Sequence, residues 1–360
     1  MEIDRVHFYV EDAKARRDWF VRYLGFAAIA SFTHTHTHTE VVQSGAVCFL
    51  LSSPLSDASP VADFLRLHPP GVADVAFSVA NLEALVQNAT AQGARLLQPI
   101  REKSLPQGTL KWAQISGWGP LTHTLIEAIG VSQSHFPLWS VDFTECWPGD
   151  RPVTPSATPF YTHIDHVVLN VANGNLESAV SFYEKTLGFQ RQQTFNIQTH
   201  RSGLHSQVMV HPHGGVQLPI NEPSSENSQI QEFLNLNRGP GIQHIALATH
   251  DILQAVAQLR ASGLSFIQVP PRYYRNLQQR QGFRKSAAQW AEIEAQEILV
   301  DWHSDDPEKM LLQTFTQPIF SQPTFFFESI ERRCQAQGFG EGNFQALFQA
   351  IEQEQIKREK

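Results

Sequence analysis

An internal duplication limits this chain to a small set of folds. The segment IDRVHFYVEDAKARRDWFVRYLGF begins at Ile3, and IDHVVLNVANGNLESAVSFYEKTLGF begins at Ile164. Each copy starts with alternating apolar residues, which are typical of a half-buried strand, and continues into an amphipathic helix that ends in Leu-Gly-Phe. The copies therefore predict the same strand-and-helix unit at two places in the chain.

A second pair of similar segments follows in the same order. GVADVAFSVANLEALVQNATAQG begins at Gly71 and GIQHIALATHDILQAVAQLRASG begins at Gly241. Each again predicts a strand and a helix that stops at a glycine, and other apolar runs predict further strands. Four β-α units in two similar halves indicate an α+β fold of curled sheets.

The duplication also predicts two domains, at residues 1–150 and 151–360. Residues 131–160 are rich in proline and serine, so we interpret them as the linker. Residues 275–296 combine charge with good helix formers and predict an exposed helix.

Composition excludes several classes of function. The 360 residues carry a net charge of −8, which disfavours nucleic acid or an anionic membrane as the main partner. No apolar run approaches the roughly 20 residues that span a bilayer, and the acidic N-terminus is unlike a signal peptide. The three cysteines are far apart, which favours a reducing compartment. We therefore expect a soluble cytoplasmic protein that binds neither nucleic acid nor membrane.

The two halves differ where polar residues interrupt the apolar strands. Ile-Asp is followed by Arg5 in the first half and by His166 in the second. At the matching place in the second pair of strands, the first half has Asp74 and the second half has His244. The second half thus carries two histidines where the first half carries an arginine and an aspartate.

A glutamate follows apolar residues near the end of each half, and we take Glu127 as the counterpart of Glu328. Two neutral imidazoles and a carboxylate on one face form a facial triad that suits non-haem Fe(II). Burying Glu328 after three phenylalanines is costly unless a partner or a metal compensates. The plainer interpretation of any one of these residues is a satisfied core histidine or an edge glutamate. The set His166, His244 and Glu328 together favours a metal site.

Around these residues the sequence resembles the 4-hydroxyphenylpyruvate dioxygenases of the vicinal-oxygen-chelate superfamily. The matching motifs are IDHVV, SGLHSQVMV, VQLPINEP, SQIQEFL, GPGIQHIAL, PPRYYRNL, LLQTFTQP, TFFFESIERR and GFGEGNFQALF. The resemblance implies two open-barrel domains, each built from paired βαβββ modules. It also implies that only the C-terminal barrel is catalytic and that a C-terminal lid helix covers its site.

The resemblance further implies a cofactor and a reaction. Fe(II) would be held by His166, His244 and Glu328. The substrates would be O2 and 4-hydroxyphenylpyruvate, an aromatic 2-keto acid. Decarboxylation, ring hydroxylation and side-chain migration would give homogentisate and CO2, in tyrosine catabolism or in quinone and tocopherol biosynthesis. Homo-oligomers, either dimers or tetramers, are usual in the family and are expected here.

Two sets of residues are implied to hold the substrate. Polar side chains would orient the phenol and the carboxylate without adding charge beside the iron, with catalytic roles for two glutamines, Gln229 and Gln313. The polar set is Ser206, Asn221, Gln229, Gln243 and Gln313, and the aromatic set that would stack on the ring is Phe315, Phe326, Phe339 and Phe344. The plainer alternative is strand polarity and core packing, which is strong for Phe326 in a chain with 24 phenylalanines.

Three other functions fit parts of the pattern. 4-Hydroxymandelate synthase resembles this sequence too and shares the substrate and the triad, but Asn221 and Phe315 favour the homogentisate product. A non-catalytic binding protein on the same fold is disfavoured by the intact triad. An extradiol ring-cleaving dioxygenase would share the ligand type but lack Gln313 and the lid motifs.

Two residues depart from the family pattern. His205 stands where asparagine is common and is a candidate extra ligand or proton donor near the pocket. Glu341 stands where a basic residue is common and would alter the pairing or the motion of the lid.

The stretch SFTHTHTHTE at residues 31–40 is a second candidate metal site. On one strand His34, His36 and His38 would share a face, with alternate side chains about 6.5–7 Å apart. That spacing is wide for three ligands of one first-row metal, whose bonds are about 2 Å long. We expect a surface strand or loop without a functional site, and at most adventitious binding of Zn or Ni.

Overall fold

The computed structural model describes residues 1–106, 108–130, 159–199, 201–280, 282 and 286–358. The first half of the chain holds β1 (Glu2–Tyr9), α1 (Ala13–Leu24), β2 (Ala27–His34), β3 (Thr37–Ser44), β4 (Val47–Pro54), α2 (Pro60–Leu67), β5 (Gly71–Ser78), α3 (Leu82–Ala91), β6 (Leu96–Leu105), β7 (Gly108–Ser116) and β8 (Thr122–Ile129). The second half holds β9 (Ile164–Asn170), α4 (Leu176–Leu187), β10 (Gln190–Gln198), β11 (Gly203–Val210), β12 (Gln217–Pro223), α5 (Gln229–Asn237), β13 (Gly241–Ala248), α6 (Ile252–Ala261), α7 (Pro271–Gln278), α8 (Ala287–Ala295), β14 (Leu299–His303), β15 (Asp306–Phe315), β16 (Phe326–Arg332) and α9 (Glu341–Arg358).

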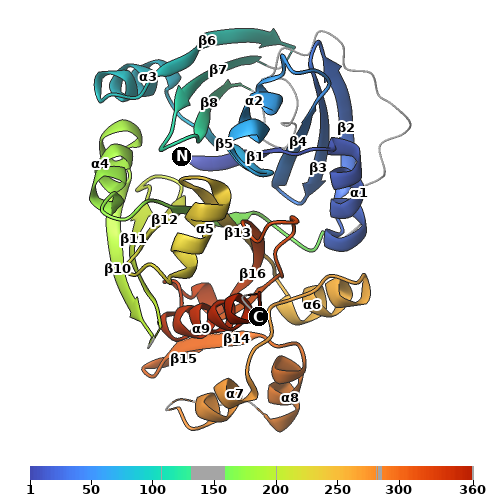
Figure 1. The fold of residues 1–360 in the computed structure, drawn as a ribbon, viewed down its shortest axis with the longest axis vertical. Coiled ribbons are helices and arrows are strands. Elements are labelled where there is room, and N and C mark those ends of the chain that lie inside the picture. Colours follow the sequence, from blue (N-terminus) through green and yellow to red (C-terminus); the bar gives the residue numbers. More distant parts are fainter. Residues whose placement is uncertain (107, 131–158, 200, 281, 283–285, 359–360) are drawn as a thin grey trace.

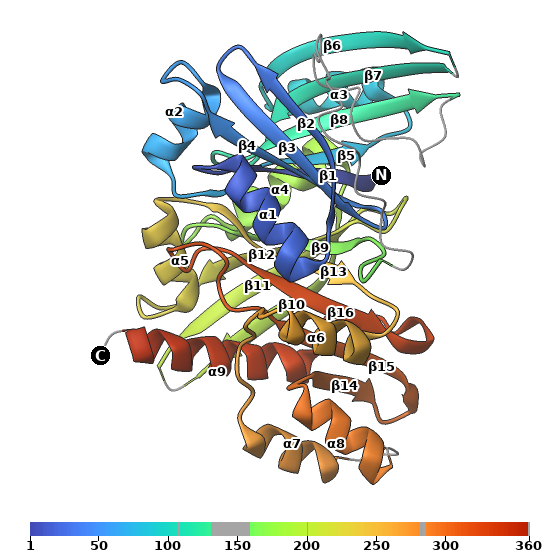
Figure 2. The same ribbon diagram turned by 90° about the vertical axis from the view of Figure 1, so that its right-hand side faces the viewer.

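The strands form two eight-stranded sheets with equivalent order. The first sheet runs β2-β3-β4-β1-β5-β8-β7-β6, and the second runs β10-β11-β12-β9-β13-β16-β15-β14. Within each sheet two βαβββ modules meet at a central antiparallel pair, β1 with β5 or β9 with β13. Both sheets curl into open barrels (Figures 1 and 2). The predicted duplication and the α+β fold are therefore confirmed.

The repeated Leu-Gly-Phe motif ends the first helix of each half. Gly25 and Gly188 adopt left-handed φ angles of 68° and 76°, which a residue without a side chain adopts at little cost. Their backbone N–H groups close helices α1 and α4 by bonding to the carbonyls of Phe20 and Tyr183. The chain then turns back, and the next phenylalanine enters the core.

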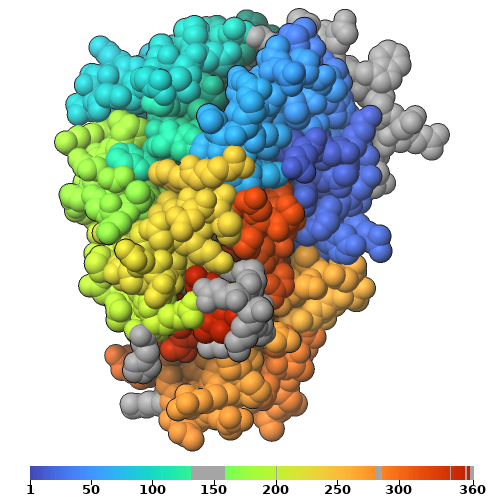
Figure 3. All heavy atoms as spheres, viewed as in Figure 1, coloured from blue at the N-terminus to red at the C-terminus, as the bar shows by residue number. Residues whose placement is uncertain are grey.

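Aromatic rings join the two halves of the chain. The ring of Phe327 in β16 lies 5.6 Å from that of Phe49 in β4 and 5.7 Å from that of Phe20 in α1, measured between centroids. Phe8 in β1 and Phe325 are 5.1 Å apart. All five side chains are buried in one continuous hydrophobic core. On the face shown in Figure 3, the blue-to-teal first half lies directly against the green, yellow and red second half.

Two expectations about segments need comment. The domain boundary at residue 150, and residues 131–158 of the expected linker, lie outside the described residues. The single helix expected at residues 275–296 was wrong, because helices α7 and α8 are separate. A capping box between Ser286 and Gln289 starts α8 and satisfies its first backbone N–H groups. None of the helices in the described ranges is long and apolar enough to cross a membrane.

The histidine run at residues 34–38, expected to be a surface strand or loop, forms a β-hairpin in which the three histidines do not share one strand face. β2 ends at His34, the chain turns, and β3 begins at Thr37. His36 Nδ1 lies 2.8 Å from Ser56 Oγ, whereas His38 Nε2 lies 2.7 Å from the buried carboxylate of Glu40. The rings thus have different partners and form no shared site in the part of the chain that the structure describes.

Candidate metal centre

Three ligand-type side chains meet on neighbouring strands in the middle of the second sheet. His166 comes from β9, His244 from β13 and Glu328 from β16. Glu328 Oε2 is 3.3 Å from His166 Nε2 and 3.7 Å from His244 Nε2. One ligand atom from each residue lies within 4.8 Å of the other two, and all three side chains are buried.

This donor set fits a divalent metal ion. Two imidazole nitrogens and one carboxylate oxygen converge from one side, which leaves the opposite side free for other ligands. Bonds of about 2 Å to a common ion would bring the three atoms to separations close to those found here. Among the described residues, this is the one group of three or more metal-ligand side chains that could hold an ion. The structure thus brings the side chains of His166, His244 and Glu328 together.

Each histidine is oriented through its other ring nitrogen. His166 Nδ1 donates to Asp165 Oδ1 over 2.8 Å, and His244 Nδ1 donates to Gln243 Oε1 over 3.3 Å. These bonds fix the tautomer that turns Nε2 of both rings toward Glu328. The ring of His166 also lies 5.0 Å from that of Phe339, and the ring of His244 is stacked on Phe326 at 4.8 Å.

The two histidines differ in their protonation. Burial opposes a charge on His166, but Glu328 and Asp165 outweigh it and raise the pKa of His166 to about 9. Burial, reinforced by His166, holds the pKa of His244 well below its ordinary value. The acidic neighbours thus favour the charged form of His166 when no metal is bound, and a metal ion that binds there would have to displace that proton.

Sequence reasoning missed the residues behind His166. Asp165 is nearly buried, and Arg332 binds its carboxylate with two hydrogen bonds of 2.7 and 2.8 Å. Burial alone would raise the pKa of Asp165, but Arg332 and His166 hold it well below its usual range. The sequence signal that could have identified Asp165 is the Ile-Asp dipeptide, because both repeats contain it. In the first repeat, Asp4 forms an ion pair with Arg5 at 3.1 Å.

The strand register identifies the counterparts in the first half. Arg5 faces Ala76 as His166 faces Ala246, which confirms the pairing of Arg5 with His166. Asp74 pairs with Thr122 as His244 pairs with Phe326, so the residue two positions on, Thr124, occupies the place of Glu328.

The pairing of Glu127 with Glu328 was therefore wrong. The counterpart of Glu127 is Glu331, and both are helix-capping carboxylates. Glu127 accepts the N–H of Leu82 at the start of α3, and Glu331 accepts the N–H of Ile252 at the start of α6. In both halves this glutamate supports a helix N-terminus, so it carries no information about the metal.

A cavity lies in front of the three ligand-type side chains. The predicted substrate residues that line it are Ser206, Gln313, Phe315, Phe339 and Phe344. Val168, Phe195, Val208, Pro219 and Leu347 complete the wall. Most of the surface is apolar or aromatic, which suits a flat ring.

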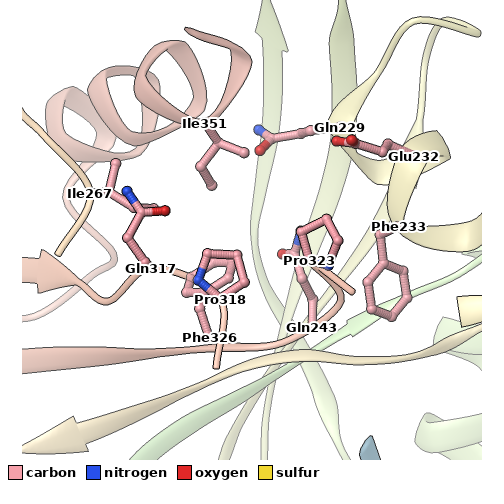
Figure 4. Close-up of a pocket in the computed structure, with 10 residues that line it drawn as sticks. All are labelled: Gln229, Glu232, Phe233, Gln243, Ile267, Gln317, Pro318, Pro323, Phe326 and Ile351. Atoms are coloured by element: carbon pink, nitrogen blue, oxygen red, sulfur yellow. The ribbon is translucent and has the colours of Figure 1, made fainter. Parts of the chain in front are cut away.

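The remaining predicted residues lie outside this cavity. Gln229, Gln243 and Phe326 line a second cavity (Figure 4), and the ring of Phe326 is stacked on His244 of the first. Asn221 is buried on β12, opposite Ser206 of β11, and its Nδ2 is 3.3 Å from Asn170 Oδ1. Gln229 Oε1 and Asn221 Oδ1 are buried oxygens without a hydrogen-bond partner among the described residues.

The two departures from the family pattern are distant from the chemistry or undescribed. His205 is half exposed and its Nδ1 lies 3.5 Å from Glu222 Oε1, so it faces away from the cavity lined by its neighbour Ser206. The expectation that His205 adds a ligand or proton donor was wrong, because successive strand residues point to opposite faces. The side chain of Glu341 lies outside the described residues.

Comparison with known proteins identifies the family. A sequence profile of the Glyoxalase/Bleomycin resistance protein/Dioxygenase superfamily matches residues 163–284, and a second profile with that description matches residues 4–108. The 4-hydroxyphenylpyruvate dioxygenase of Yarrowia lipolytica is 38% identical over 99% of this chain and 92% of its own length. The chain belongs to the 4-hydroxyphenylpyruvate dioxygenase family.

Two further similarities are informative. An uncharacterised protein of Synechocystis is 35% identical and matches 98% of this chain and 97% of its own length. Among solved structures, a triple-substitution variant of 4-hydroxymandelate synthase from Streptomyces coelicolor superposes with a TM-score of 0.83 at 26% identity, covering 98% of both chains. The family is thus established, and the neighbours include enzymes named for two different reactions.

Proposed function

We propose that this protein is an Fe(II)-dependent dioxygenase that converts 4-hydroxyphenylpyruvate and O2 to homogentisate and CO2. The observation that carries the proposal is the buried set of His166, His244 and Glu328 at one end of an aromatic-walled cavity. These three residues would hold Fe(II), whose donor preference they match. Bound iron would supply open coordination positions for the keto acid and O2, and the electrons that activate O2.

Gln313 sets the direction of the carboxylate in this proposal. Its Nε2 donates to Glu328 Oε1 over 2.8 Å, which leaves Oε2 as the atom that faces both histidines. Gln313 is neutral, so it holds the carboxylate without adding charge beside the metal. Its role is to position Glu328 and to border the substrate cavity.

The aromatic wall would hold the substrate ring and exclude water. Phe339 and Phe344 come from the segment at the start of α9, and Phe315 comes from β15. Rings on several sides favour a flat aromatic substrate through dispersion and edge-to-face contact. A dry cavity also protects reactive species from side reactions with water.

The polar groups next to the cavity would recognise the phenol. Gln229 Oε1 and Asn221 Oδ1 are buried acceptors without a partner among the described residues, so a phenolic O–H is a suitable donor for either. Gln229 and Gln243 line the second cavity together with Phe326, whose ring stacks on His244.

Product analysis tests the proposal. The protein is reconstituted anaerobically with Fe(II), supplied with 4-hydroxyphenylpyruvate and O2, and the product is identified. Homogentisate formed with CO2 supports the proposed reaction. Iron bound in one equivalent without any oxygen uptake would refute it and leave a non-catalytic binding protein.

A second reaction is supported by one observation, the similarity to the structure of a 4-hydroxymandelate synthase variant. That enzyme type would share the three metal ligands and the substrate but would oxidise the benzylic carbon. Formation of 4-hydroxymandelate in the same assay would assign that reaction. Asn221 and Phe315 favour the homogentisate outcome, in a step of tyrosine catabolism or of quinone and tocopherol biosynthesis.

A further inference from the structure

Arg332 connects the orientation of a metal-ligand side chain to the root of the helix that covers the cavity. It ends β16, the strand that carries Glu328. Its Nε and Nη2 donate to the two oxygens of Asp165, which accepts from His166. Its Nη1 donates to the carbonyls of Gly338 and Ala336, at 2.8 and 3.2 Å. One guanidinium thus bonds to both the support of His166 and the segment that leads into α9.

This segment has a backbone conformation that needs external support. Cys334 and Gln335 have left-handed φ angles of 50° and 58°, which residues with side chains seldom adopt. Such strain persists only where surrounding contacts over-determine it. Arg332 binds the carbonyls of Ala336 and Gly338, one and three residues after Gln335, so it supplies such contacts. Phe339, the next residue, then lies with its ring 5.0 Å from that of His166.

A second set of hydrogen bonds connects Glu328 to the first turn of α9. Gln313 donates to Glu328 and accepts from Asn343 Nδ2 over 2.8 Å. Asn343 is buried and accepts the hydroxyl of Tyr273 over 2.7 Å. A Cβ at Gly340 would lie 2.9 Å from Gln313 Oε1, so the absent side chain permits this close approach. His166 and Glu328 are therefore both bonded, through one or two intermediates, to the start of the lid.

The helix itself closes the cavity. Phe344 and Leu347 of α9 line the wall in front of the ligand-type residues, and α9 lies across the second sheet beside α5 and β14 (Figure 1). A change at its first turn alters the cavity directly.

We propose that Arg332 is a positioning residue that couples metal binding to closure of α9. The proposal rests on the proposed function in that it takes His166 and Glu328 as metal ligands. With the metal bound, His166 is held at both ring nitrogens, so Asp165 and Arg332 are fixed and the bonds to Ala336 and Gly338 keep the lid closed. Because linkage is reciprocal, a closed lid raises the affinity for the metal by the same factor.

Hydrogen exchange with and without Fe(II), measured anaerobically and without substrate, tests the coupling. In the unchanged protein the metal slows exchange of the α9 amides by about fivefold or more, the lower end of typical coupling factors. In Arg332→Gln this protection falls below about twofold while one equivalent of metal still binds at saturating concentration. The affinity of Arg332→Gln for Fe(II) falls by at least the factor by which its metal-induced protection of α9 is reduced.

Arg333→Gln is the matched control. Arg333 is the next residue and also binds a carboxylate, but its hydrogen bonds go to Glu331 and not, among the described residues, to the side chain of Asp165. This variant keeps the full metal-induced protection. Equal protection in Arg332→Gln and the control would overturn the proposal. So would lower metal affinity with undiminished protection, since Arg332 would then support only His166.

A conservative variant keeps the test decisive if Arg332→Gln fails to fold. Lysine retains the charge beside Asp165, but its single ammonium lacks the planar fork that reaches two partners. Arg332→Lys is therefore expected to unfold cooperatively at a similar denaturant concentration and still lose the protection of α9. Undiminished protection in this variant would also overturn the coupling.

The test of the coupling and the test of the proposed reaction can fail independently of each other. Exchange and metal affinity are measured without substrate, so a protein that forms no homogentisate can still show metal-induced closure. Conversely, homogentisate formation with an unprotected α9 would leave the reaction in place and remove the role of Arg332.

Discussion

Removing the ring of Phe49 should destabilise both halves of the molecule together. Phe49 is fully buried, and its ring lies 5.3–5.6 Å from the rings of Phe8, Phe20, Phe26 and Phe327. Replacing a buried phenylalanine with alanine costs about 3–5 kcal/mol, and aromatic pairs add about 0.5–1.5 kcal/mol each when independent. Because the four pairs share one ring and are not additive, we expect a loss of about 4–5 kcal/mol.

Equilibrium unfolding in urea measures this loss. With an m-value of about 3 kcal/mol/M, the midpoint of Phe49→Ala should fall by about 1.3–1.7 M. Tryptophan fluorescence and far-UV circular dichroism should still give coincident transitions, because the ring contacts Phe327 across the boundary between the halves.

Phe64→Ala is the matched control for this experiment. Phe64 is only half-buried on α2 and packs against Tyr9 and His68, away from the boundary. Its loss should cost about 1–2 kcal/mol. A Phe49→Ala effect no larger than that of Phe64→Ala would refute the role assigned to the aromatic cluster. So would two separated transitions in the unchanged protein.

Three further predictions concern acid stability, metal affinity and the histidine hairpin. Burial lowers the pKa of His123 from 6.5 to about 4, so its contribution to stability is complete above pH 6.5 and is lost as the pH falls toward 4. Between neutral pH and about pH 4.5, the free energy of unfolding of the unchanged protein should therefore fall by about 2–3 kcal/mol more than that of His123→Gln, as measured by urea titration. Gln313→Leu removes the hydrogen bond to Glu328 and should weaken Fe(II) binding by about 10–100-fold, measured by anaerobic calorimetry; an unchanged affinity would contradict the role of Gln313. Replacing all three hairpin histidines with serine should leave the metal stoichiometry at one equivalent, while thermal unfolding shows a loss of about 1 kcal/mol from the lost bond to Glu40.

The architecture was predictable because both of its signals are periodic and repeated. Alternating apolar residues and the Leu-Gly-Phe helix ends identify equivalent units in each half, and the register confirms that Arg5 and His166 occupy the same place. His166, His244 and Glu328 were recognisable because each interrupts an apolar strand with a side chain that is costly to bury alone.

Features that depend on local geometry were not predictable in this way. Glu127 and Glu328 both follow apolar residues, and only the register shows that they differ by three positions. The histidine run alternates like a strand, but a turn between His34 and Thr37 separates its members. Arg332 is far in sequence from Asp165, and its hydrogen bonds to Ala336 and Gly338 are to backbone carbonyls. Hydrogen bonds to backbone carbonyls do not depend on the side chain of the accepting residue, so the sequence of residue types does not indicate them.

The location of His166, His244 and Glu328 on three adjacent strands has a consequence for how the protein acquires its metal. Neighbouring strands are joined by backbone hydrogen bonds, so the ligand atoms are brought together when the sheet forms and no loop has to deliver them. We therefore expect folding to precede metal loading, in contrast to small domains that fold around an ion. The metal-free protein is a folded reserve, and the supply of metal after synthesis determines how much of it becomes active.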